Sequence, residues 1–300
     1  MSDEPLLLDE KTRRKLEQVM LSASRVRAGA MKGERRSIKR GTSIEFADYR
    51  NYVRGDDLRR LDWNIYGRLD RPFIKLLEDE EDLAVHLLLD VSASMDWPQE
   101  GERDHNKLLF AKRLFAGLAY ISLASNDRML MSAIGERGSE HFGPVRGRGH
   151  SVRMLRYVHG LQAKGVTDLN AALKDYVMRA GRPGLCLIIS DMFSPAGYLD
   201  GLNTLLGKGY EVGLIHVLSP DEVEPPLGGD LRLIDVETNE PQEVTIDAGM
   251  RDLYIRRLEA WRASIREECV RRSVHYIPVE TDMVWEKVIL YEMRRLGLVK

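Results

Sequence analysis

An acidic residue and two hydroxyl residues alternate directly after a long apolar stretch of this chain. Residues 83–89 read LAVHLLL, and Asp90, Ser92 and Ser94 follow in the pattern Asp-x-Ser-x-Ser. A run this apolar is typical of a buried strand in a parallel sheet, and ligand sites in such sheets lie beyond the carboxyl ends of the strands. Carboxylate and hydroxyl oxygens are hard ligands that suit Mg²⁺. Asp and Ser are also common turn and helix-capping residues, so the pentapeptide alone leaves both interpretations open.

Two later segments carry hard oxygen ligands in comparable positions. Thr167 precedes the apolar-periodic residues 169–180, and Asp191 follows a second apolar run at residues 185–189. The order Asp-x-Ser-x-Ser, then Thr, then Asp resembles the metal-ion-dependent adhesion site of von Willebrand factor A (VWA) domains. This resemblance implies a site for Mg²⁺, or another divalent cation, formed by Asp90, Ser92, Ser94, Thr167 and Asp191. In that family pattern the hydroxyls ligate directly, one aspartate often acts through water, and one position stays open to an anionic oxygen of a partner.

The upstream segment narrows the resemblance. It reads IEFADYR at residues 44–50, GDD at 55–57 and RLDW at 60–63, followed by Arg68 and an acidic run at 78–82. This order is similar to that of domain-of-unknown-function family 58, a VWA-like family. In bacteria and archaea its genes often neighbour those of MoxR-type AAA+ ATPases. The resemblance therefore implies a MoxR-type AAA+ ATPase and its client proteins as partners.

The hydrophobic pattern predicts an α/β fold. Strands are expected at 83–89, 128–134, 185–189, 212–218 and 274–279, with a short edge strand at 139–145. Helices are expected at 108–124, 151–160, 169–180, 195–206 and 283–296, and a further helix carries Leu258, Trp261, Ile265 and Cys269 on its apolar face. This alternation indicates a VWA-like, doubly wound, mainly parallel sheet with helices on both faces. A peripheral β-hairpin is expected near 231–246.

Three regions are expected along the chain. Residues 1–40 form an N-terminal helix over 10–28 and a basic loop, residues 41–79 form a family-specific segment packed on the core, and residues 80–300 form the VWA-like domain. In the middle segment Asp56, Asp57 and Asp62 could form a partner-binding surface. Alternatively, these carboxylates satisfy backbone donors and arginines, while Trp63 and its aromatic neighbours pack the segment onto the sheet.

Composition excludes several classes of protein. The net charge of −2 gives no global attraction to nucleic acid, and the basic residues at 32–40 lack the interleaved aromatics of a nucleic-acid arm. The two cysteines do not make a disulfide framework, and no apolar stretch approaches the ~20 residues that span a bilayer. We therefore expect a cytoplasmic protein with no membrane span.

Signatures of catalysis are missing. The chain has no phosphate-binding loop, no His-Glu-x-x-His zinc helix and no Gly-x-Ser-x-Gly elbow. Asp168 could act as a base, but helix capping is the simpler interpretation, and His86 and His216 are expected to be hydrogen-bonded structural histidines. The preferred interpretation is a metal-dependent protein-interaction module and not an enzyme. A Mg²⁺-dependent hydrolase of phosphoesters and a scaffold with an empty site are the alternatives.

Overall fold

The computed structural model describes residues 7–23, 44–53, 61–79, 83–99, 103–136, 138–226, 229–234, 241–246 and 248–300. Contacts divide the chain into two compact units. The first, here called the sheet unit, comprises Met1–Lys32 and Leu83–Lys300; the second, the inserted unit, comprises Gly33–Asp82. Residues 7–23 therefore belong to the sheet unit.

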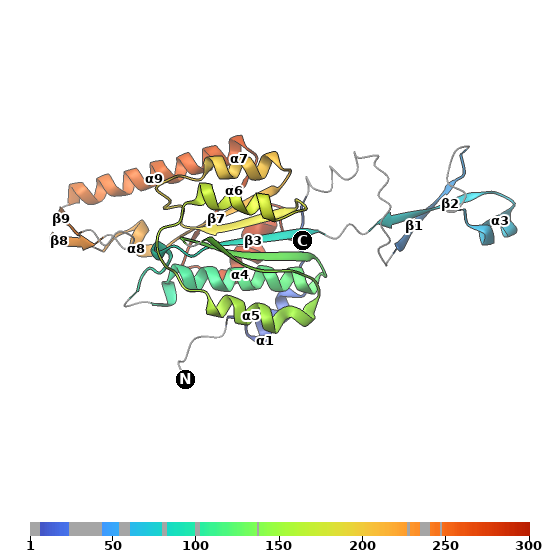
Figure 1. The fold of residues 1–300 in the computed structure, drawn as a ribbon, viewed down its shortest axis with the longest axis horizontal. Helices are drawn as coiled ribbons and strands as arrows, with labels where there is room; N and C mark the ends of the chain where they lie inside the picture. Colours follow the sequence, from blue (N-terminus) through green and yellow to red (C-terminus); the bar gives the residue numbers. More distant parts are fainter. Residues whose placement is uncertain are drawn as a thin grey trace. The chain divides into compact units, whose positions relative to one another are not determined.

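A six-stranded sheet organises the sheet unit, with strand order β10–β7–β6–β3–β4–β5 (Figure 1). The bounds are β3 Ala84–Asp90, β4 Arg128–Gly135, β5 Gly138–Val145, β6 Leu185–Ser190, β7 Glu211–Leu218 and β10 His275–Glu280. All neighbours pair in parallel except β5, which runs antiparallel to β4 at one edge. The mainly parallel α/β sheet expected from the sequence is therefore confirmed, with β3 and β6 as central neighbours.

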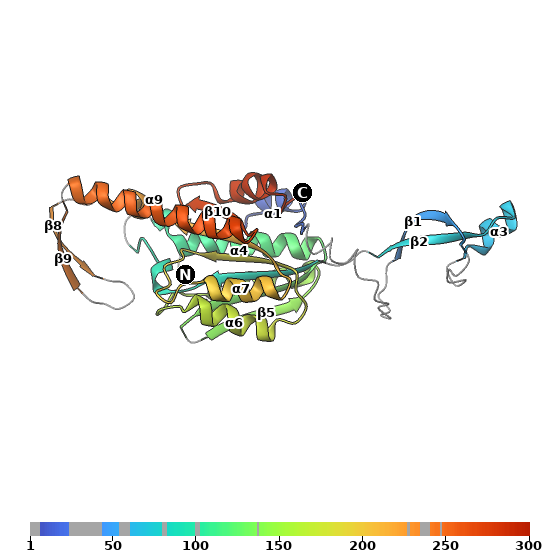
Figure 2. The same ribbon diagram turned by 90° about the horizontal axis from the view of Figure 1, so that it is seen from above.

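Helices cover both faces of this sheet (Figures 1 and 2). One face carries α1 Glu10–Leu16, α4 Lys107–Ala124 and α5 Ser151–Gly160; the other carries α6 Leu169–Arg179, α7 Leu199–Gly207 and α9 Ala248–Arg271. Every residue of β3 is buried. Its side chains alternate between two apolar clusters, with Leu87 and Leu89 in one and Leu88 in the other. Two covered faces explain why this strand is a continuous apolar run and not an alternating one.

Two helices are shorter than the sequence pattern predicted. The N-terminal helix, expected over 10–28, ends at Leu16, and Leu21 forms an antiparallel bridge with Val299. Val19 and Ala23, which were expected on the apolar face of this helix, are therefore buried in the non-helical segment that follows it. The helix expected at 195–206 begins only at Leu199, after Gly197 adopts a positive φ of 74°.

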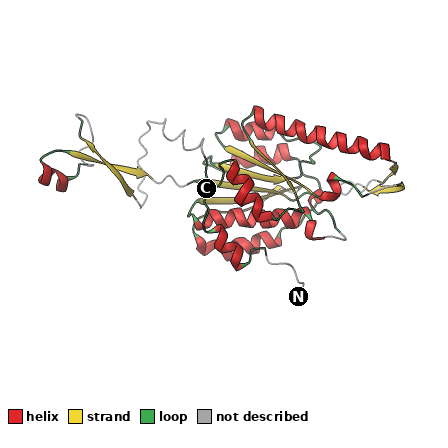
Figure 3. Ribbon diagram, turned by 180° about the vertical axis from the view of Figure 1, so that it is seen from behind, coloured by secondary structure: helices red, strands yellow, loops and turns green. Residues whose placement is uncertain are grey.

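The remaining elements lie at the ends of the sheet unit. The short helix α8, Pro220–Val223, follows β7, and β8 Gly229–Ile234 pairs antiparallel with β9 Pro241–Ile246 beside the start of α9 (Figure 3). The last helical segment consists of α10 Trp285–Lys287 and the π-helix η5 Val288–Met293. Both cysteines are buried and free. Within the described ranges, no helix has the length and apolar character needed to cross a membrane.

Where the structure describes it, the inserted unit shows an antiparallel strand pair and a helix. Its elements are β1 Ile44–Asn51, α3 Trp63–Leu69 and β2 Phe73–Asp79. Asp62 caps α3, because its side chain accepts the backbone N–H groups of Asn64 at 2.9 Å and Ile65 at 3.2 Å. This contact matches the expectation that a carboxylate here satisfies backbone donors. Asp56, Asp57 and the basic residues at 32–40 lie outside the described residues.

Candidate metal centre

The parallel sheet brings the candidate ligands to one edge. Asp90 ends β3 and Asp191 directly follows β6, and these two strands are parallel neighbours. The loop that contains Thr167 contacts the segment after β6 through the Ser194 hydroxyl, which donates to the Thr167 carbonyl at 3.0 Å, and the segment after β3 through two backbone hydrogen bonds. Lys164 donates to the carbonyl of Val91 at 2.8 Å, and Ala93 donates to the carbonyl of Gly165 at 2.8 Å. Three chain segments therefore meet at the carboxyl ends of the central strands.

Asp90 is a buried carboxylate held by neutral donors. The Ser190 hydroxyl donates to Oδ2 at 2.7 Å, and the backbone N–H of Ser92 donates to Oδ1 at 2.9 Å. Burial, together with the neighbouring charge of Asp191, raises the pKa of Asp90 to about 6. Among the residues that the structure describes, no basic side chain forms an ion pair with Asp90. A buried carboxylate without a counter-charge is costly, so this position favours a cation.

Three hydroxyls accompany this carboxylate. Ser92 and Ser94 lie together, with their Oγ atoms 3.0 Å apart. The Thr167 hydroxyl is buried, and its Oγ1 has no hydrogen-bond partner in the described part of the chain. Leaving a buried hydroxyl unpaired costs roughly 1–3 kcal/mol. A ligand that accepts the Thr167 oxygen into its coordination shell would remove this penalty.

Asp191, unlike Asp90, forms an ion pair with a buried lysine. The ammonium of Lys107 lies 2.7 Å from Asp191 Oδ2 and 2.6 Å from Glu222 Oε1, and the Lys107 side chain is 0% exposed. Asp191 Oδ1 accepts the backbone N–H of Phe193 at 3.1 Å. Burial opposes the charged ammonium, but the two carboxylates outweigh it and raise the pKa of Lys107 above its ordinary value. Burial also raises the pKa of Glu222, and Lys107 offsets only part of that effect.

Local helix geometry positions this buried ion group. Asn106 caps α4 by accepting the backbone N–H of Leu109 at 3.0 Å, so Lys107 is the first residue of the helix. Glu222 Oε2 accepts the backbone N–H of Ser219 at 2.8 Å, which orients its carboxylate at the start of α8. The ring of Phe193 completes the enclosure, with its centroid 5.1 Å from Lys107 Nζ. Neither Lys107 nor Glu222 could be identified from the sequence, because a lysine after a helix cap and an acid in a short helix are usually solvated.

Other candidate residues have structural roles, as expected. Asp168 caps α6 by accepting the backbone N–H of Ala171 at 2.9 Å. His86 Nδ1 contacts the Tyr176 hydroxyl at 2.6 Å, and its Nε2 contacts a backbone carbonyl at 3.0 Å. His216 has the same pair of contacts, to the Tyr276 hydroxyl at 2.8 Å and a backbone carbonyl at 3.1 Å. The interpretation of both histidines as hydrogen-bonded core residues is therefore confirmed.

The donor chemistry suits a hard divalent cation. Within the described ranges no group of three or more His, Cys, Asp or Glu side chains could hold a metal, so an ion at this place would need hydroxyl and water ligands. The Asp90 carboxylate and the unpaired Thr167 hydroxyl fit such an ion. Asp191 fits it less well, because its Oδ2 already binds an ammonium. Mg²⁺ tolerates this kind of site, since it keeps several waters and takes few protein ligands.

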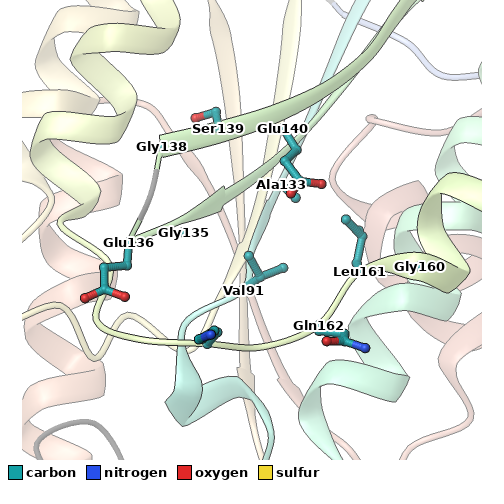
Figure 4. Close-up of a pocket in the computed structure, with 11 residues that line it drawn as sticks. Val91, Ala133, Gly135, Glu136, Gly138, Ser139, Glu140, Gly160, Leu161 and Gln162 are labelled. Atoms are coloured by element: carbon teal, nitrogen blue, oxygen red, sulfur yellow. The ribbon is translucent and has the colours of Figure 1, made fainter.

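A pocket of about 310 Å³ lies beside the candidate centre (Figure 4). Val91, between the candidate ligands Asp90 and Ser92, forms one wall; the turn after β4 contributes Glu136, and strand β5 contributes Glu140. The loop after α5 contributes Leu161 and Gln162. The centre therefore adjoins a surface depression that is partly acidic and partly apolar.

A family model described as proteins of unknown function, DUF58, matches residues 48–264. The chain belongs to the DUF58 family. Uncharacterised proteins of Mycobacterium tuberculosis and Mycobacterium bovis are 30% identical to this DUF58 chain over 261 residues, which is 86% of this chain and 81% of theirs.

Two solved structures from Bacteroides resemble the DUF58 chain at low sequence identity. A conserved hypothetical protein BatB of Bacteroides thetaiotaomicron is 16% identical, with a TM-score of 0.44, over 72% of this chain and 98% of that one. An aerotolerance-related membrane protein of Bacteroides fragilis is 17% identical, with a TM-score of 0.44, over 71% of this chain and 99% of that one.

Proposed function

We propose that this DUF58 protein is a metal-dependent protein-interaction module of the VWA type, in which a divalent cation recruits an acidic side chain of a partner. One observation carries the proposal: the buried Asp90 carboxylate has no cationic partner among the described residues and shares its edge of the sheet with the unpaired Thr167 hydroxyl. Asp90, Ser92, Ser94 and Thr167 would hold the ion, with Asp191 nearby. The bound ion would supply positive charge to attract an anionic oxygen.

Exposed apolar side chains around this edge support a protein partner. Trp97 lies in the loop after β3, Phe193 in the loop after β6, and Met283 and Val284 in the loop after β10. Between 37% and 52% of each residue is exposed. Because these three strands are parallel, their following loops lie at the same edge. Exposed aromatic and apolar side chains near a charged centre are typical of a protein interface.

The family resemblance suggests which partner this is. We propose a MoxR-type AAA+ ATPase and client proteins, with this protein helping the ATPase to remodel, mature or assemble those clients in the cytoplasm. The partner would present an Asp or Glu to the ion. The ATPase would supply the nucleotide hydrolysis, since the DUF58 chain carries no phosphate-binding loop.

Calorimetric titration with Mg²⁺ tests the centre itself. Wild-type protein should bind the ion, and Asp90→Ala should abolish binding because it removes the carboxylate that lacks a counter-charge. Ser92→Ala should weaken binding less, since water can replace a neutral ligand. Glu267→Gln, an exposed residue of α9, is the control and should bind like wild type. Unchanged Mg²⁺ affinity in the Asp90 variant would refute the site.

A pull-down with the ATPase, with and without chelator, tests the recruitment of a partner. Chelation and Asp90→Ala should each weaken capture by roughly thirtyfold or more, the cost of truncating a desolvated charge contact. Their effects should not add, because both remove the same contact. If the purified chain hydrolyses phosphoesters with Mg²⁺ and Asp90→Ala loses that activity, the protein is a hydrolase and the proposal of an interaction module is wrong.

A further inference from the structure

The ammonium of Lys107 lies inside the candidate metal centre, and the proposed function does not account for it. We propose that Lys107 is a resident cation, which neutralises Asp191 and thereby lowers the affinity of the centre for a divalent ion. The inference rests on the proposed function and assigns a role to a residue that the metal-binding pattern does not include. It assigns different roles to two neighbouring carboxylates, of which Asp191 has a counter-charge and Asp90 has none among the described residues.

The geometry places the ammonium as a fixed part of the centre. Lys107 Nζ binds Asp191 Oδ2 at 2.7 Å and Glu222 Oε1 at 2.6 Å, with no exposure to solvent. A charge this deep is costly unless it is paired on several sides. The positive end of the α4 dipole adds to the cost, because Lys107 is the first residue of that helix. The two carboxylates must outweigh both penalties, so the ammonium is tightly held between them.

This arrangement makes the two aspartates unequal. Asp191 directs one oxygen to Lys107 and the other to a backbone N–H group, whereas the described donors to Asp90 are all neutral. A divalent ion at the centre would therefore depend on Asp90 and the hydroxyls. Because Lys107 cancels one nearby negative charge, the ion would be bound more weakly and would keep more of its positive charge. That residual charge is available to a partner's carboxylate.

Glu222 competes with Asp191 for the Lys107 ammonium, so it controls the strength of the Lys107–Asp191 ion pair. Its second oxygen is held by the backbone N–H of Ser219 at 2.8 Å, and its carbonyl accepts the Tyr254 hydroxyl of α9 at 2.6 Å. The carboxylate thus has a fixed place opposite Asp191. Removing its charge should strengthen the pairing of Lys107 with Asp191 and also remove a negative charge near the ion.

Two substitutions should therefore change Mg²⁺ affinity in opposite directions. Lys107→Met keeps the length of the side chain and removes the charge, so we expect Mg²⁺ to bind about tenfold more tightly or better, given the strength of charge interactions at these separations. The melting temperature of this variant should fall in chelator and recover with Mg²⁺. Glu222→Gln should bind Mg²⁺ more weakly than wild type.

Lys112→Met provides a matched control on the same helix. Lys112 is also buried and donates to the carbonyl of His159 at 3.1 Å, on α5. Its loss should lower stability without changing Mg²⁺ affinity. A rise in affinity at Lys107 alone therefore reports the charge of the centre and not a loosened helix.

Calorimetry on the full chain separates the possible results. If wild type binds Mg²⁺ and Lys107→Met binds it equally or more weakly, the inference is wrong while the proposed function stands. If Lys107→Met does not fold, Glu222→Gln decides: weaker binding supports the inference, and unchanged or tighter binding overturns it. If neither wild type nor any variant binds the ion, the proposed function fails, and the inference fails with it.

Discussion

The Thr167 hydroxyl provides a test of whether this edge of the sheet binds a ligand or is only a polar part of the core. Thr167 Oγ1 is buried without a described partner, so Thr167→Val removes an unpaired oxygen and keeps the shape of the side chain. We expect the free energy of unfolding in chelator to rise by about 1 kcal/mol, because the desolvation penalty of that oxygen disappears. Mg²⁺ affinity should fall in the same variant. Urea unfolding and calorimetry measure the two quantities.

Thr281→Val is the matched control for this substitution. Thr281 is also buried, but its Oγ1 donates to the carbonyl of His105 at 2.5 Å. Its valine variant should lose about 1 kcal/mol of stability, the net worth of a hydrogen bond. Equal destabilisation at both positions would show that the Thr167 hydroxyl is satisfied in solution.

A buried histidine makes stability depend on pH. Burial lowers the pKa of His86 to about 4, from an ordinary value of 6.5. Below pH 6.5 His86 is protonated in the unfolded chain but stays neutral in the folded chain. The contribution of neutral His86 to stability is therefore fully present above pH 6.5 and is lost as the pH falls toward 4. The full loss is about 3 kcal/mol at ~1.4 kcal/mol per pKa unit. Urea unfolding from pH 7.5 to 4.5 should show it. His86→Gln should reduce the slope and leave the part that comes from His216, whose pKa is also lowered to about 4 by burial. An unchanged slope in that variant would contradict the assignment.

At the scale of the element, one glycine lets two helices approach each other. A Cβ atom at Gly201 of α7 would lie 2.7 Å from the Cβ of Leu173 on α6. Gly201→Ala should therefore force α6 and α7 apart and cost about 1–3 kcal/mol of stability. Gly207, at the end of the same helix, has nothing within 4 Å of such an atom. Gly207→Ala should stabilise the protein by about 0.5–1 kcal/mol, and thermal unfolding of both variants measures the contrast. Equal effects would show that the helix contact is adjustable.

Elements buried on both faces could be predicted from the sequence, and elements decided by tertiary contacts could not. Strand β3 reads as a continuous apolar run because both its faces are covered. The N-terminal helix was predicted too long because Leu21 is buried by pairing with Val299, a contact that local spacing does not reveal. Lys107 was missed for the same reason. Its partners lie 84 and 115 positions away, and nothing local marks a lysine as buried.

At the scale of the molecule, the division into two units limits how far a bound ion can stabilise the chain. A ligand at one hundred times its dissociation constant adds about 2.7 kcal/mol to the unit that holds it. With Mg²⁺ we therefore expect amides of β3 and β6 in the sheet unit to exchange hydrogen up to about one hundredfold more slowly. Amides of β1 and β2 in the inserted unit should be unchanged. Hydrogen exchange followed by mass spectrometry measures both, and equal protection would show that the two units unfold together.

The bond between Ser190 and Asp90 joins positions 100 residues apart. At a translation rate of about 5–20 residues per second, the ribosome adds Ser190 on the order of 5–20 s after Asp90. Throughout that interval the Asp90 loop has neither the Ser190 hydroxyl nor the loop of Asp191 beside it. The surface that would hold the ion therefore exists only after β6 has paired with β3. A partner that bound this surface would distinguish a finished protein from one still being made.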